Sequence, residues 1–225
     1  MEKLYYEDSS YTKRIITFIG AILTYYASWY FGRDILMSLF HGYIKDGLLQ
    51  PKLFFSHVLI YGSIFSAICS YLFIYIAYKN RVLKLPKFMS NIKEAFLYGF
   101  SSALILSFLV VLYWLSQDYN FKFLVNWPSV FGNIFSNLYE EVSYRALLVG
   151  ATLALFRNKW IAIVIPSIIM VSTHTQYSFR VRNCIVFFGS CVFCYVYIRT
   201  CNLVSPWAYT PSVRYDSRHC LKGLD

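Results

Sequence analysis

The sequence predicts an all-α protein, a polytopic bundle of about six transmembrane helices. The composition is 58% hydrophobic and 20% aromatic but only 14% charged, whereas a soluble domain carries about 25% charged residues. The charges are also absent from several long stretches, and most of these reach the roughly 17–25 apolar residues that a spanning helix needs. Both observations indicate a surface that faces a lipid bilayer rather than water.

The helices are predicted where the charges are missing. In chain order, the apolar stretches are residues 15–32, 53–78, 95–117, 123–139, 160–179 and 183–198. The fourth is expected to continue as a helix through Phe156, and the chain is expected to turn at residues 157–159. Residues 1–204 therefore form one predicted transmembrane core, with the motifs described below in about residues 95–204. Residues 205–225 form an atypical polar tail that is too poor in apolar residues to cross a bilayer.

The basic residues predict the orientation in the membrane. The net charge is +10, and the loop of residues 79–93 holds five Lys and Arg side chains and no acidic one. The positive-inside rule makes this loop cytoplasmic, which places the N-terminus in the cytoplasm as well. Because the positive charges lie in short loops, we expect membrane lipid rather than nucleic acid as a partner. The expected location is a multi-pass, integral position in a prokaryotic cell membrane.

A short charged segment interrupts the fourth apolar stretch. Residues 138–145 read LYEEVSYR. Glu141 and Arg145 are spaced i, i+4 with the acid first, which favours a helical ion pair. Glu140 lies about 100° around the helix from Glu141, so it cannot share Arg145 as easily and is expected to lack an obvious local partner. An ionisable residue within a membrane costs about 2.5–3.5 kcal/mol on insertion scales and usually marks a functional site. The carboxylate of Glu140 is therefore suited to general-base catalysis. For Glu141 and Arg145, a purely structural ion pair is the alternative.

A histidine in the next apolar stretch is the candidate partner of Glu140. His174 lies within MVSTHTQYS, about as many residues after the predicted turn as Glu140 lies before it. Two helices joined by a short turn run antiparallel, and each residue advances about 1.5 Å along its helix. The two side chains are therefore predicted to lie at similar depth. The alternative is a histidine at the membrane interface with no catalytic role.

These two motifs together resemble those of a protease family. The pattern EExxxR at residues 140–145, followed in the next span by an apolar residue four positions before a histidine, is similar to the CAAX protease and bacteriocin-processing family, also called CPBP or Abi. The resemblance covers about residues 95–210, with Met170 in place of the usual phenylalanine. It implies an intramembrane endopeptidase that hydrolyses a peptide bond of a membrane-associated protein or peptide.

The resemblance also implies roles for single residues. Glu140 and His174 would hold and activate the attacking water, and Glu141 and Arg145 would support the site through their pairing. Two glutamates and a histidine are also possible zinc ligands. Because Glu141 is expected to pair with Arg145, the metal-free route without any cofactor is favoured, and zinc is the alternative.

A third family motif, His-xxx-Asn/Asp after a proline, is altered here. Thr210 stands where the histidine is expected, and Arg214 stands four residues further on. One hypothesis is a shifted reading frame in the tail of residues 205–225; the other is a shortened, catalytically inactive relative that acts as an immunity or partner-binding membrane protein. A transporter or channel is a third class, which the lack of an inverted-repeat signal disfavours.

Overall fold

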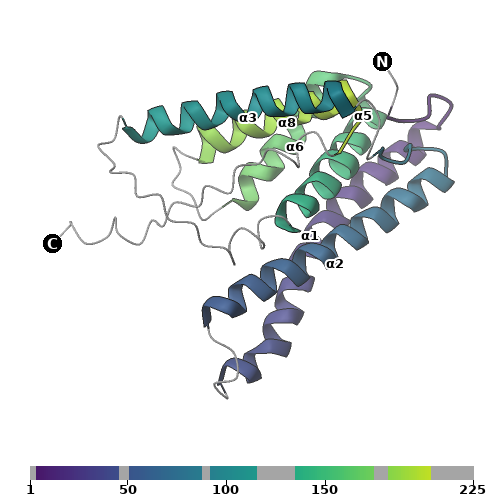
Figure 1. The fold of residues 1–225 in the computed structure, drawn as a ribbon. Coiled ribbons are helices and arrows are strands. Elements are labelled where there is room, and N and C mark those ends of the chain that lie inside the picture. The colour runs from purple at the N-terminus through teal and green to yellow at the C-terminus, as the bar shows by residue number, and fades with distance from the viewer. Residues whose placement is uncertain (1–3, 46–50, 88–91, 116–134, 175–181, 204–225) are drawn as a thin grey trace.

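The computed structural model describes residues 4–45, 51–87, 92–115, 135–174 and 182–203, and within them every regular element is a helix (Figure 1). The predicted all-α fold is therefore confirmed for this part of the chain. In chain order the elements are α1 (Tyr11–Lys45), α2 (Pro51–Lys79), α3 (Ile92–Leu115), η1 (Glu141–Val149), α5 (Gly150–Phe156), α6 (Lys159–Thr173), η2 (Arg182–Val186) and α8 (Phe187–Thr200).

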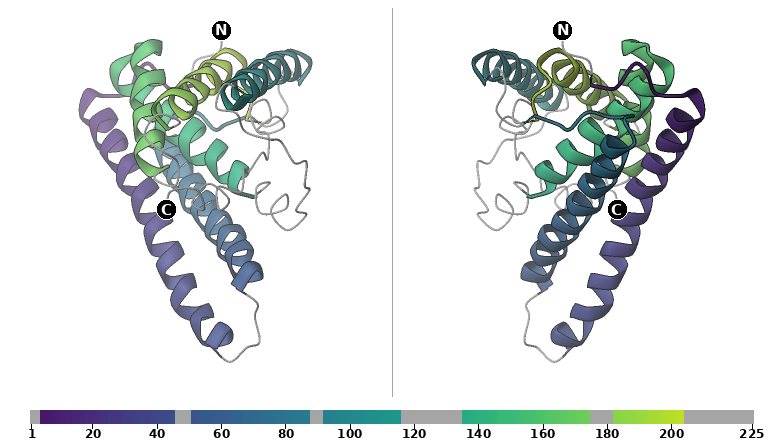
Figure 2. Two further views of the ribbon diagram at one scale, coloured as in Figure 1. Left: turned by 90° about the vertical axis from the view of Figure 1, so that its left-hand side faces the viewer. Right: turned by 90° about the vertical axis from the view of Figure 1, so that its right-hand side faces the viewer.

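Helices α1 and α2 are antiparallel and form the long arm of the molecule (Figure 1). Figure 2 shows the two helices side by side. Two glycines of α1 permit the contact: a Cβ at Gly20 would lie 2.6 Å from the ring of Phe73, and one at Gly32 would lie 2.7 Å from the ring of Phe65. Without side chains on α1 at these positions, the phenyl rings of α2 pack directly on its backbone.

The arm begins as predicted and extends further than predicted. The apolar stretch of residues 15–32 lies within α1, but the helix continues past Arg33 to Lys45. The charges at residues 33 and 34 therefore end the apolar stretch and not the helix. Helix α2 contains the whole second stretch, residues 53–78.

The described helical segment that follows α3 in the chain packs against both helices of the arm. Residues 135–140, η1 and α5 follow one another without a break, so this part of the fourth predicted helix runs through Phe156 as expected. Element η1 packs against α2, and α5 packs against α1. The hydroxyls of Ser70 and Ser143 form a buried hydrogen bond of 2.7 Å between α2 and η1. The N-terminal part of this predicted helix, residues 123–134, lies outside the described residues.

The turn after α5 is where the sequence predicted it. Arg157 ends α5 in the left-handed conformation, at φ 53°. Asn158 caps α6, because its side-chain oxygen accepts hydrogen bonds from the backbone N–H groups of Trp160 and Ile161. Helix α6 then returns along α5 and η1, while α8 packs on α6 and α3 packs on α8.

Two of the described helices are long and apolar enough to cross a membrane. These segments are Tyr11–Gly32 within α1 and Tyr61–Lys79 within α2. Shorter apolar helices are Phe96–Leu109, Lys159–Thr173 and Cys184–Thr200. The number of spans predicted from the sequence is larger than these two, and it stays a prediction.

Candidate active site

The charged segment lies in an unusual helical turn. Residues Glu141–Val149 form a π-helix, in which backbone hydrogen bonds join residues i and i+5. This form is rare and is found mostly as short insertions in α-helices, often at functional sites. Because a π-turn is wider than an α-turn, residues five positions apart, such as Glu140 and Arg145, come to the same side of the helix.

Arg145 consequently faces both glutamates. Its Nη1 atom lies 3.3 Å from Oε1 of Glu141 and 4.0 Å from Oε2 of Glu140. The predicted pairing with Glu141 is present. Glu140 was expected to share the arginine less easily than Glu141, and its longer distance agrees with that expectation. It was also expected to lack an obvious local partner, and here the π-helix makes the difference by bringing Arg145 within 4.0 Å.

The ion pair of Glu141 and Arg145 is completely enclosed. Each side chain is 1% exposed, and the guanidinium carbon of Arg145 lies 5.7 Å from the ring centre of Phe193 on α8. Within the described residues, neither carboxylate oxygen of Glu141 has a hydrogen-bond partner that meets normal geometry. The opposite charge of Arg145 is therefore the principal compensation for burying this carboxylate.

His174 lies directly after the last turn of α6 and faces Glu140. Its Nδ1 atom is 2.8 Å from the carbonyl oxygen of Met170. A carbonyl can only accept, so Nδ1 carries the hydrogen, and Nε2 of the neutral ring is an acceptor. Nε2 lies 3.9 Å from Oε1 of Glu140, and the two side chains are 17% and 16% exposed. The predicted match in depth is confirmed by this distance.

The sequence analysis missed the groups that surround these side chains. The carbonyl of Met170 holds the histidine ring, and the hydroxyls of Tyr25, Tyr144 and Thr173 form a partly buried cluster next to it. Tyr144 lies inside the EExxxR motif and Thr173 directly precedes His174, so their positions in the sequence offered a signal. Nothing in the sequence pattern singles out Tyr25.

The donor atoms near Glu140 are few for a metal centre. A catalytic zinc takes about three protein ligands, whereas Glu141 faces Arg145, which leaves Glu140 and His174. Across the described ranges, no group of three or more His, Cys, Asp and Glu side chains could hold a metal ion. These residues do not fit the zinc alternative, and no step below uses a metal.

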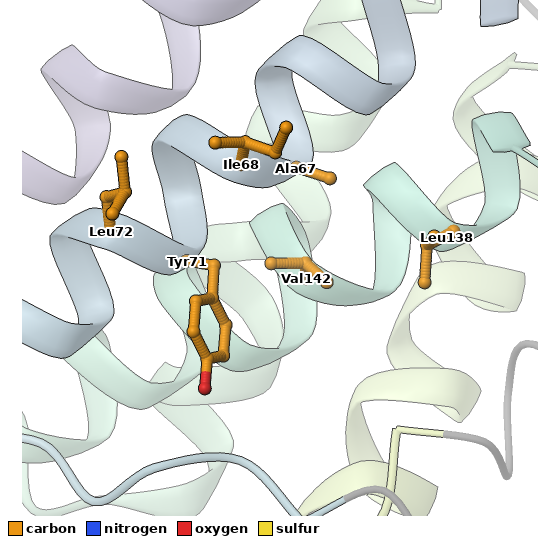
Figure 3. Close-up of a pocket in the computed structure, with 6 residues that line it drawn as sticks. All are labelled: Ala67, Ile68, Tyr71, Leu72, Leu138 and Val142. Carbon is orange, nitrogen blue, oxygen red and sulfur yellow. The ribbon is translucent and has the colours of Figure 1, made fainter.

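An apolar pocket of about 340 Å³ lies between α2 and the helix that carries Glu140 (Figure 3). It is lined by Ala67, Ile68, Tyr71, Leu72, Leu138 and Val142. Glu140 lies roughly 200° around the helix from Leu138, so the pocket and the carboxylate are on different sides of this helix. A lining of this kind suits an aliphatic chain.

The altered third motif cannot be placed next to these groups. Pro206, Thr210 and Arg214 lie outside the described residues. Asn202, at the described end of the chain, is fully buried and pairs with Lys87 through an isolated backbone bridge.

Comparison with known proteins identifies the family that the two motifs resemble. Residues 122–209 match the family model described as type II CAAX prenyl endopeptidase, Rce1-like. This segment contains Glu140, Glu141, Arg145 and His174, and the match confirms the resemblance to CAAX proteases. The matching family consists of membrane-embedded proteases. No match was found among curated proteins or among solved structures.

Proposed function

We propose that this protein is an intramembrane endopeptidase that uses Glu140 and His174 to activate a water molecule. The observation that carries the proposal is the separation of 3.9 Å between Oε1 of Glu140 and Nε2 of His174. The two atoms belong to residues 34 positions apart in the sequence, and they meet where both side chains keep some exposure. The family match over this segment supplies the reaction class.

The geometry suits a water molecule held by two acceptors. With Nδ1 of His174 donating to Met170, both Nε2 and the ionised carboxylate of Glu140 accept hydrogen bonds. The distance of 3.9 Å is too long for a direct hydrogen bond between them. One water beside both atoms can donate a hydrogen to each, which leaves its lone pairs directed at a substrate.

The reaction then follows general-base hydrolysis. Glu140 takes a proton from the water as the water oxygen bonds to the carbonyl carbon of the scissile peptide. The tetrahedral intermediate collapses with cleavage of the C–N bond, and the protonated Glu140 returns the proton to the leaving nitrogen. The products are a carboxylate and an amine, and the enzyme regains its initial state.

The buried pair of Glu141 and Arg145 supports the position and charge of Glu140. Arg145 is buried between the two carboxylates, so it offsets the repulsion between them and fixes the helical turn from which Glu140 projects. The pair has almost no exposed surface through which it could contact substrate. We therefore assign it a supporting role.

The bundle would hold this site within a bilayer. Large apolar side chains are exposed along α1, α2 and α3, as expected for contact with lipid. The end of the bundle that carries the start of α1 and the end of α2 has basic side chains beside aromatic rings, namely Arg14 on Tyr11, Lys79 on Tyr75, Arg81 on Tyr6 and Lys159 on Trp160. This arrangement supports a cytoplasmic N-terminus for a multi-pass core of residues 1–204. A prokaryotic cell membrane as its location stays a prediction.

The substrate class follows from the name of the matching family. We propose a membrane-associated protein or peptide with a prenylated CAAX C-terminus, in which a cysteine carries the lipid and is followed by two aliphatic residues and a last residue. Cleavage after the prenylated cysteine would release the last three residues. The apolar pocket on α2 offers a surface for an aliphatic chain.

The test is peptide cleavage by the full chain in liposomes, with a farnesylated CAAX peptide as probe and mass spectrometry of the products. We expect cleavage by the wild type and a loss of at least about 100-fold in Glu140→Gln, because a general base contributes about 10²–10⁴-fold. Glu94→Gln is the matched control, since Glu94 also faces an arginine, Arg199 at 3.8 Å, but at an exposed position on α3. Unchanged cleavage by Glu140→Gln would refute the proposed mechanism.

A non-catalytic membrane protein of the immunity or partner-binding kind is the second candidate. The observation in its favour is Thr210 in place of the histidine of the third family motif, because loss of one oxyanion donor costs about 10²–10³-fold in rate. Wild-type protein without any cleavage of the farnesylated peptide, together with normal folding, would favour this candidate.

A further inference from the structure

Two buried tyrosine hydroxyls and the partly buried hydroxyl of a threonine connect the two halves of the candidate site. They belong to Tyr25 on α1, Tyr144 on η1 and Thr173 at the end of α6, and we call them the hydroxyl clamp. Oγ1 of Thr173 is 2.6 Å from the hydroxyl of Tyr144 and 3.1 Å from that of Tyr25. The two tyrosine hydroxyls also lie in contact with each other. The tyrosine side chains are almost fully buried, at 1% and 2% exposure.

The clamp residues lie close in the chain to both proposed catalytic residues. Tyr144 lies one helical turn after Glu140, and Thr173 directly precedes His174. The hydrogen bond between Tyr144 and Thr173 therefore fixes the helix of the glutamate against the end of the helix that presents the histidine. Tyr25 adds a third element, because it donates to Thr173 from α1.

The clamp ends on the same acceptor as the histidine ring. The hydroxyl of Thr173 donates to the carbonyl of Met170 at 2.9 Å, and Nδ1 of His174 donates to that carbonyl at 2.8 Å. This carbonyl lies in the last turn of α6, where intrahelical partners run out. The backbone N–H of His174 bonds to Val171 instead. Two side-chain donors thus use the two lone pairs of one carbonyl oxygen.

We propose that the hydroxyl clamp positions His174, setting both its distance from Glu140 and its Nδ1–H tautomer. This inference rests on the proposed function, since it assigns positioning residues to the same site. His174 is outside the helix, at φ −89° and ψ 53°, so regular backbone bonding does not fix its ring. Loss of the clamp would free the last turn of α6 and let the ring leave the Met170 carbonyl.

A parallel contact one residue earlier gives a matched control. The hydroxyl of Tyr26 on α1 lies 3.1 Å from Oγ of Ser172, and that oxygen donates to the carbonyl of Ile169 at 2.7 Å. The construction repeats that of Tyr25, Thr173 and Met170, but Ile169 does not hold the histidine ring. Removing this second contact perturbs packing between α1 and α6 without touching the carbonyl that His174 uses.

The direct test reads the tautomer of His174 by NMR, without any substrate. The full chain is labelled with ¹⁵N-histidine in detergent micelles, at a pH where the ring is neutral, and two-bond ¹H–¹⁵N spectra distinguish the tautomers. Four histidines contribute, and the signal lost in His174→Ala assigns the one of interest. We expect the Nδ1–H form in the wild type and an exchanging mixture in Tyr25→Phe and Thr173→Val.

The controls decide between positioning and general packing. Tyr26→Phe, Ser172→Ala and Thr173→Ser should keep the wild-type tautomer, the last because serine retains the hydroxyl. A wild-type protein with the Nε2–H tautomer of His174 would overturn the proposal. Clamp variants that keep the wild-type spectrum would overturn it as well. So would control variants that change the spectrum as much as the clamp variants do. If Thr173→Val does not fold, the tautomer of His174 in Tyr25→Phe tests the proposal, because this variant keeps the aromatic ring and loses only the hydroxyl.

Cleavage kinetics provide a second readout that separates the two proposals. On the farnesylated peptide, Tyr25→Phe and Thr173→Val should lower kcat by about 10- to 100-fold with KM unchanged, as expected for small misplacement of catalytic groups. An active Glu140→Gln enzyme would defeat the proposed function and leave the tautomer result intact. A clamp variant with wild-type kcat would defeat the positioning role alone.

Discussion

Replacement of Arg145 by methionine is expected to lower the free energy of unfolding by about 3–5 kcal/mol, the usual cost of breaking a buried ion pair. Its Nη1 atom is 3.3 Å from Glu141 and 4.0 Å from Glu140. Coulomb's law at an effective dielectric constant of about 20 gives about 5 kcal/mol for the first pair and about 4 kcal/mol for the second. Part of the second contribution is lost to screening, because Glu140 is 16% exposed.

Because Arg145 has two carboxylate partners, removing the arginine and removing one glutamate should lower the free energy of unfolding by different amounts. Glu141→Gln leaves the arginine with Glu140, whereas Arg145→Met leaves Glu141 buried beside a second carboxylate. We therefore expect Glu141→Gln to cost less than Arg145→Met. The double variant should recover part of the loss, because a neutral pair leaves no buried charge next to Glu140.

The assay is unfolding by SDS in mixed micelles, followed by far-UV circular dichroism and tryptophan fluorescence on the four proteins. Unfolding free energies at a common SDS fraction give the coupling between residues 141 and 145. A cost below about 1 kcal/mol for Arg145→Met, in the range of exposed ion pairs, would refute the reasoning. A double variant as unstable as Arg145→Met would refute it as well.

Two further predictions concern the helices that position the site. Gly20→Ala places a Cβ 2.6 Å from the ring of Phe73, so we expect a loss of about 1–3 kcal/mol from overpacking in the same SDS assay. Gly189→Ala is its control, because the nearest atom, on Leu106, is 3.8 Å away; equal costs for the two variants would contradict the close contact of α1 and α2. Asn158→Ala removes the cap of α6 and should cost about 1 kcal/mol, and an unchanged unfolding midpoint would show that the cap contributes nothing.

Much of the architecture could be predicted because the controlling signals are local. Long charge-free stretches mark the helices, and the residues around Arg157 and Asn158 mark the turn between α5 and α6. The antiparallel return then follows from the shortness of the turn. With it comes the equal depth of Glu140 and His174, which the distance of 3.9 Å confirms.

The details of the site could not be predicted because they depend on departures from regular helix geometry and on long-range contacts. The π-helix of Glu141–Val149 changes which residues share a side, and no residue in that segment signals it. That is why Glu140, which was expected to lack an obvious local partner, has Arg145 within 4.0 Å of its carboxylate. The contact of Tyr25 with Thr173 joins residues 148 positions apart in the chain, and only the fold reveals it.

The central claim is that Glu140 and His174 act on one water molecule, and a double-mutant cycle on kcat/KM for the farnesylated CAAX peptide tests it most directly. Residues that act as a unit show strongly non-additive losses. We expect Glu140→Gln and His174→Gln each to lower kcat/KM by at least about 100-fold, and the double variant to lose about as much as the more damaged single variant. Losses that multiply, or single variants with wild-type kcat/KM, would contradict the account.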